Sequence, residues 1–182
     1  MLRLMYRTDR IYVTENHELY AYLDGFAHKA KCLHNAALFR VRNAFTAYNK
    51  TALTANEKEV QGELALLKGQ KSYYVLGYGI LQRLMRITNN PDFFSGLPMQ
   101  TAQHVIRQVC TDFKGWLASL KKYRKDSSGY TGKPKMPGYC RNDTTSYLFT
   151  NQDAVIYDGK LKLPPCLKVS ERQILNLFVH IA

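Results

Sequence analysis

Apolar residues recur three or four positions apart through residues 17–48, a spacing that places them on one face of a long α-helix. We expect Thr14 or Asn16 to cap the start of this helix. The same spacing predicts a shorter helix at about 57–68 and a second long helix at about 98–124. The apolar stripe of that second long helix is Met99, Ala102, Ile106, Val109, Phe113, Trp116 or Leu117, and Leu120.

Strands are expected at both ends of the chain, where apolar residues alternate with polar ones. Residues 2–13 predict one or two strands, and residues 146–150 predict another. Residues 155–163 predict a hairpin, because Asp158-Gly159 fits a two-residue turn whose central positions need positive φ. Residues 126–138 carry three glycines and two prolines and are expected to form a loop. This order predicts an α+β fold, a small β-barrel or sheet with a helical insertion.

The charge of the chain points to a polyanionic partner. Its 182 residues include 26 Lys and Arg against 14 Asp and Glu, and self-repulsion at this net charge of +12 opposes compaction. Between Arg107 and Arg141 nine cationic residues face only Asp112 and Asp126, with tyrosines interleaved. Cationic groups neutralise phosphates and aromatic rings stack on bases, so this segment predicts nucleic-acid binding. The alternative is a solvated helix end whose tyrosines only pack.

Cysteine usage and hydropathy indicate the compartment. Cys32, Cys110, Cys140 and Cys166 form no CxxC pair and have no histidine at zinc-finger spacing, which argues against a zinc site. Scattered thiols suit the reducing cytoplasm. We also expect no secretory signal and no membrane span, because no apolar run is long enough for either.

The sequence contains no complete catalytic motif. His17-Glu18-Leu19-Tyr20-Ala21 begins like a zinc-protease motif but lacks the second histidine. The sequence holds no Walker loop and no G-x-S-x-G motif, and the acids are too scattered to predict a metal-binding set. We therefore expect a protein that is not an enzyme, with no cofactor, no metal and no catalytic residues.

Three segments, in order, resemble the N-terminal part of TnpB, a family of transposon-encoded RNA-guided DNA nucleases related to type V CRISPR effectors. The first is Asn16-His17-Glu18-Leu19-Tyr20 followed by residues 31–42. The second, residues 97–107, is similar to the family's L-P-x-Q-x-x-Q-x-x-x-R helix, and the third, residues 130–139, to its G-x-P-x-x-P-x-Y/F loop. Cys140 departs from the family's usual Lys, and the tail after Pro164 no longer matches.

The resemblance implies a fold and a domain order. In TnpB this region forms the wedge domain, an oligonucleotide-binding-like β-barrel, with a helical recognition domain inserted between its strands. It implies first wedge strands at 1–15, a recognition insertion at 16–125, and the remaining wedge strands and a divergent tail at 126–182. The family's RuvC nuclease domain and zinc ribbon have no counterpart in the 182 residues.

The implied function is that of a nuclease-less, TnpB-like protein that binds structured guide-type RNA, an RNA–DNA heteroduplex or duplex DNA. Alternatives are an inhibitor or decoy of an RNA-guided nuclease, of anti-CRISPR type, and one half of a split effector. Tyr130 and Tyr139 would stack or hydrogen-bond. The candidate contacts to nucleic acid are Arg40, Gln100, Gln103, Arg107, Lys114, Lys121, Lys122, Arg124, Tyr130, Lys133, Lys135 and Tyr139.

Overall fold

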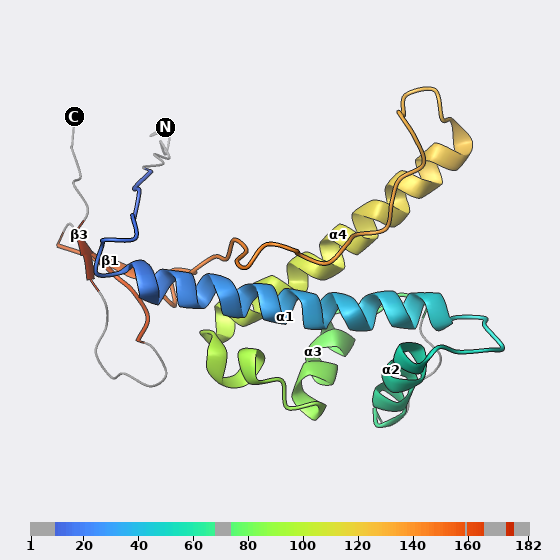
Figure 1. Ribbon diagram of the computed structural model, residues 1–182, viewed down its shortest axis with the longest axis horizontal. Helices are drawn as coiled ribbons and strands as arrows, with labels where there is room; N and C mark the ends of the chain where they lie inside the picture. Colours follow the sequence, from blue (N-terminus) through green and yellow to red (C-terminus); the bar gives the residue numbers. More distant parts are fainter. Residues whose placement is uncertain (1–9, 68–73, 159, 166–173, 177–182) are drawn as a thin grey trace, which may run out of the picture.

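The computed structural model describes residues 10–67, 74–158, 160–165 and 174–176. Helices form most of this part of the chain, and a small sheet lies at one end (Figure 1). The elements are α1 (Tyr20–Ala47), α2 (Ala55–Ala65), α3 (Tyr78–Ile87), the short π-helix η1 (Asp92–Gly96), α4 (Met99–Lys125), β1 (Val155–Tyr157), β2 (Lys160–Lys162) and β3 (Ile174–Asn176). The predictions of two long helices and one shorter helix are confirmed, with small shifts at their ends.

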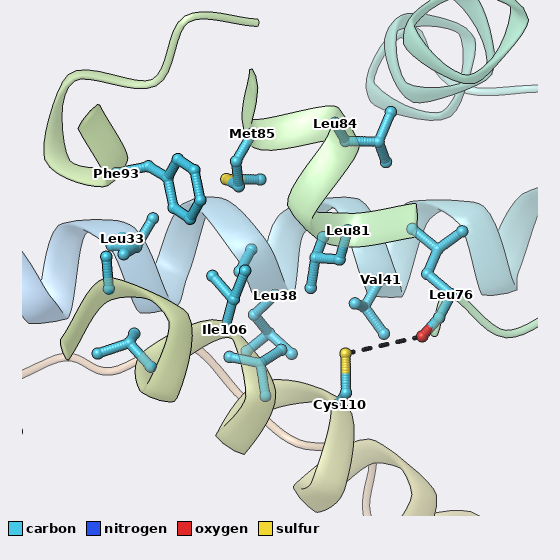
Figure 2. Packing of buried hydrophobic residues seen from close by; sticks show 14 of the residues in the cluster. Leu33, Leu38, Val41, Leu76, Leu81, Leu84, Met85, Phe93, Ile106 and Cys110 are labelled. Carbon is cyan, nitrogen blue, oxygen red and sulfur yellow. Dashed lines mark hydrogen bonds between the residues drawn. The ribbon is translucent and has the colours of Figure 1, made fainter. Parts of the chain in front are cut away.

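The core lies where the apolar faces of α1 and α4 pack against each other, with α3 and η1 covering the same region. Figure 2 shows Leu38 of α1, Leu81 of α3 and Ile106 of α4 directed into this core. Phe113, near the middle of α4, is fully buried, as its place in the predicted stripe requires. Met99, the first member of that stripe, is exposed instead, because it lies at the end of the helix where fewer elements cover it.

The start of α1 differs from the prediction. Its N-cap is Leu19, which offers no side-chain cap, so the expected cap at Thr14 or Asn16 is wrong. The Nδ1 atom of His17 accepts a hydrogen bond from the Leu19 N–H at 3.1 Å instead. Residues 10–13 form no strand, and the rest of the strand predicted over 2–13 lies outside the described residues.

The start of α2 is held by a capping box. The Thr54 hydroxyl accepts from the Glu57 N–H, and the Glu57 carboxylate accepts from the Thr54 N–H at 2.9 Å. Lys50 donates to the same carboxylate at 2.6 Å. The hydrogen bond from Lys50, with others from Thr46 and Thr54, lowers the pKa of Glu57 from 4.5 to about 2. The folded chain therefore stabilises the ionised form of Glu57 relative to its protonated form.

We expect Glu57 to make the stability of the fold depend on pH. A carboxyl group whose pKa is lower in the folded state than in the unfolded state stabilises the fold when it is ionised. This stabilisation is complete above the unfolded-state pKa and is lost as the pH falls through the folded-state pKa. The free energy of unfolding should therefore fall between about pH 4.5 and pH 2. Urea titrations of the wild type and of Glu57→Gln at several pH values would measure this. Their difference should be largest near neutral pH and vanish near pH 2; a difference independent of pH would contradict it.

The sheet contains the predicted hairpin but no barrel. β1 and β2 pair antiparallel, with Val155 opposite Lys162, and Asp158 has a φ of 50°, the left-handed conformation that the turn needs. β3 adds to β2 in the order β1-β2-β3. The expected α+β fold with a wedge-type β-barrel is wrong for the described chain, which is mostly helical with a single three-stranded sheet. Strands of three residues are too few and too short to close a barrel, which takes about five or more.

The strand predicted at residues 146–150 is also wrong. Residues 131–150, which we call the return segment, form no strand and run back along α4 and then along α1 (Figure 1). The Thr145 N–H donates to the Ala27 carbonyl of α1 at 3.2 Å, and the Asn35 side chain exchanges hydrogen bonds of 2.8 and 3.0 Å with the Cys140 backbone. Hydrogen bonds to α1 therefore take the place of the bonds to a neighbouring strand that the alternating apolar pattern predicts.

Candidate nucleic-acid interface

The C-terminal half of α4 and the loop after it project beyond the other helices (Figure 1). Seven cationic residues lie in the C-terminal half of α4 and the loop after it, and all of them are exposed. We call them the basic arm: Lys114, Lys121, Lys122, Arg124, Lys125, Lys133 and Lys135. Three of the seven lie in the last turn of α4, where cations also stabilise the helix through its dipole.

The periodicity of α4 separates its cations from its core residues. Arg107, Lys114 and Lys121 are seven positions apart and therefore lie in one row along the helix. At 1.5 Å per residue the row is roughly 20 Å long. All three are exposed, whereas Phe113, about 100° round the helix from Lys114, has no exposed surface. One face of α4 packs and another presents a line of positive charge to solvent.

The cations of the basic arm are available to an external partner. In the part of the chain that the structure describes, the ion pairs join Arg40 to Glu63 and Lys50 to Glu57, both away from the arm. Asp112 of α4 accepts a hydrogen bond from Gln108 at 2.8 Å. Asp126 accepts from the Ser128 N–H at 2.9 Å, and hydrogen bonds from Ser128 lower the pKa of Asp126. Neither acid forms an ion pair with the arm's cations.

The predicted contacts at the start of α4 are less open than the arm. Gln100 and Gln103 are half-buried, while Arg107 is exposed. The Arg107 guanidinium lies over the ring of Tyr78, at 4.9 Å from its centroid. Such a cation–π contact holds the guanidinium in place while leaving its edge free to donate. Arg107 therefore connects the row on α4 with the start of α3.

The two candidate tyrosines differ in accessibility. Tyr130 is half-buried and packs edge-on against Tyr123, with ring centroids 5.5 Å apart. Tyr139 is exposed, and the Arg42 guanidinium lies 5.4 Å from its ring centroid. Arg42 also donates to the Pro137 carbonyl and so fixes the return segment beside the ring. Of the two rings, Tyr139 offers more surface for stacking.

Arg40 is placed in the core, apart from the arm. It is 8% exposed and makes a bidentate pair with Glu63 of α2, at 2.7 and 2.8 Å. Its third donor bonds the Ala36 carbonyl at 3.0 Å. With three of its five N–H donors used inside the fold, the buried Arg40 joins α1 to α2.

We expect Arg40→Met to destabilise the fold by about 2 kcal/mol, because it leaves the Glu63 carboxylate half-enclosed without its partner. Thermal melts would measure the loss, and the double variant with Glu63→Gln should recover part of it. RNA affinity should stay unchanged once the protein is folded. A stable Arg40→Met protein with weakened RNA binding would contradict the structural role.

The sequence did not predict that Arg42 and Tyr78 contact the candidate nucleic-acid-binding residues. Arg42 reaches Tyr139 from α1, and Tyr78 reaches Arg107 from α3. Their partners are distant in sequence, so no local spacing could have paired them. The only signal was composition, namely an abundance of Tyr and Arg in a strongly basic chain.

Comparison of the chain with family models, curated proteins and solved structures finds no match. Among the described residues, no helix is long and apolar enough to cross a bilayer. Within the same residues, no group of three His, Cys, Asp or Glu side chains is placed to hold a metal ion. The basic arm and the motifs in the sequence are therefore the features of this chain that bear on its function.

Proposed function

We propose that this chain binds structured RNA through the basic arm of α4 and the loop that follows it. The observation that carries the proposal is a projecting helix end and loop with seven exposed cations that no acid of the described chain pairs. Unpaired cations repel one another, and a phosphate backbone relieves that repulsion while releasing its own counterions.

The geometry favours recognition of shape over sequence. A row of cations roughly 20 Å long on a rigid helix can follow phosphates along a duplex. Protein contacts to A-form duplexes are made mainly to the backbone and to 2′-hydroxyls. Arg107, Lys114 and Lys121 supply the row, and Lys133 and Lys135 supply charge from the returning loop. RNA helices and RNA–DNA heteroduplexes are thus the preferred partners, ahead of B-form DNA.

The resemblance to TnpB supports a guide-type RNA as the partner, bound by a nuclease-less relative of that family in the cytoplasm. The matching L-P-x-Q-x-x-Q-x-x-x-R segment spans the start of α4 and ends at Arg107, the first cation of the row. This proposal requires no β-barrel. Sequencing of RNA that co-purifies with the chain would test it, and enrichment of one structured RNA is the expected result. A random sample of cellular RNA would contradict the guide-type assignment.

Binding should weaken steeply with salt. Each phosphate neutralised on a duplex contributes a slope of about −0.9 to log K against log salt. With several arm cations in contact, affinity for a structured RNA should fall by on the order of 100-fold or more between about 50 and 200 mM salt. Fluorescence anisotropy with labelled RNA, RNA–DNA and DNA duplexes of equal length would measure it. An affinity that stays level over this range would show that the arm is only a solvated surface.

A further inference from the structure

A cleft of about 440 Å³ lies between α1, α4 and the return segment. Its walls carry His34 of α1, and His104 and Gln108 of α4. Residues 145–148 of the return segment form the third side, and Val105 and Leu148 add apolar surface. This volume falls within the range of small-ligand sites, roughly 300–1,000 Å³. The proposed nucleic-acid contacts do not include this cleft.

The backbone of the return segment presents free hydrogen-bonding groups to the cleft. The Thr145 N–H donates to the Ala27 carbonyl of α1, and the Leu148 carbonyl accepts from Thr101 of α4 at 3.0 Å. Ser146 lies between these two residues and lines the cleft. Its backbone N–H and C=O have no hydrogen-bond partner among the described residues.

The side chains opposite add further free groups. Gln108 uses its amide N–H on Asp112, which fixes the side chain and leaves its carbonyl oxygen as an acceptor. The imidazole of His104, which lines the cleft, has no hydrogen-bond partner in the described part of the chain. The cleft thus combines the backbone donor and acceptor of Ser146, the amide oxygen of Gln108 and the flat ring of His104. Asp112 is the acidic residue that lines it.

We propose that this cleft binds a single nucleobase, either an unpaired base of the RNA or the base of a free nucleotide. Every nucleobase carries an adjacent donor and acceptor on its Watson–Crick edge, which matches the adjacent N–H and C=O of Ser146. Imidazole rings stack on bases, and the apolar walls take the remaining face. A phosphate is disfavoured, because Asp112 lines the cleft and no Lys or Arg does.

The position of the cleft relative to the arm supports an RNA base as the source, and this part of the inference rests on the proposed function. Gln108 follows Arg107 directly, so the two side chains lie about 100° apart around α4. A strand whose phosphate contacts Arg107 can therefore turn one unpaired base toward Gln108. The basic arm would hold the backbone and the cleft would select an unpaired position.

Nucleosides test the cleft without the arm, since they carry no phosphate. Adenosine titrated into the ¹⁵N-labelled full chain should shift the Ser146 amide signal, and N6,N6-dimethyladenosine, which lacks the amino donors, should bind about tenfold more weakly. Ribose 5-phosphate should leave that signal in place. Absence of any adenosine effect at Ser146, or equal binding of both nucleosides, would overturn the proposal.

Two RNA hairpins of equal length and charge identify the source of the base, one fully paired and one with a single bulged adenosine. The wild type should bind the bulged hairpin several-fold more tightly, and Gln108→Leu should abolish that preference without changing the salt slope. Gln61→Leu on α2 is the matched control and should change neither. A preference that persists in Gln108→Leu would overturn the RNA source, whereas adenosine binding without a bulge preference would assign the cleft to a free nucleotide.

These measurements separate the cleft from the proposed function. Adenosine binding by a chain with no salt-dependent RNA affinity would refute the arm and retain the cleft. Salt-dependent RNA binding without any response to adenosine or to the bulge would refute the cleft and retain the arm.

Discussion

Replacing Phe113 by Ala should destabilise the fold by about 3–5 kcal/mol, the usual loss for a fully buried Phe. Its ring lies where α4 meets α1, 5.3 Å from Phe45 of α1 and 5.1 Å from Trp116 of α4 itself, by ring centroids. Trp116 in turn donates to the Pro134 carbonyl at 3.1 Å, so the ring also supports the return segment. Urea denaturation followed by circular dichroism would measure the loss.

Phe94→Ala is the matched control for that variant. Phe94 is 43% exposed and meets Phe93 only edge-on, so its removal should cost about 1 kcal/mol or less. The two variants lose the same atoms and differ only in burial. If both melted alike, or if Phe113→Ala stayed as stable as the wild type, the packing of α4 against α1 would need to be reassigned.

Converting Lys114, Lys121, Lys133 and Lys135 to Gln should weaken RNA binding by on the order of 100-fold or more at low salt. Each lost phosphate contact should also reduce the salt slope by about one. All four side chains are exposed and none takes part in an ion pair of the described chain, so the melting temperature should stay close to that of the wild type. Lys122, Arg124 and Lys125 are retained because they stabilise the last turn of α4.

The control removes the same net charge from other surfaces. Gln substitutions at Arg10, Lys58, Arg83 and Lys160 replace exposed cations of the N-terminal segment, α2, α3 and β2. If the arm is the interface, this variant should lose far less affinity than the arm variant and keep a steep salt slope. Equal losses of affinity in the two variants would mean that net charge alone drives binding and that the basic arm is not the RNA interface.

The sequence by itself determined the elements that depend on local interactions. Apolar residues three or four apart bury one face whatever the helix meets, so α1 and α4 and the burial of Phe113 were predictable. The hairpin was predictable for a similar reason, because Asp158-Gly159 selects the turn from within. The seven arm cations were found as a charged segment, although the sequence did not show that they project from the fold.

Tertiary structure decided the features whose partners are distant along the chain. Residues 146–150 alternate like a strand, yet α1 and α4 hold that region, so no barrel forms among the described residues. Arg40 resembled a surface cation until Glu63 of α2 was brought against it. The cleft beside Ser146 exists only where α1, α4 and the return segment meet. The periodicity of a sequence shows which face of an element is apolar. The packing of segments that are distant in the sequence decides which groups fill the space beside that face and where a cleft remains.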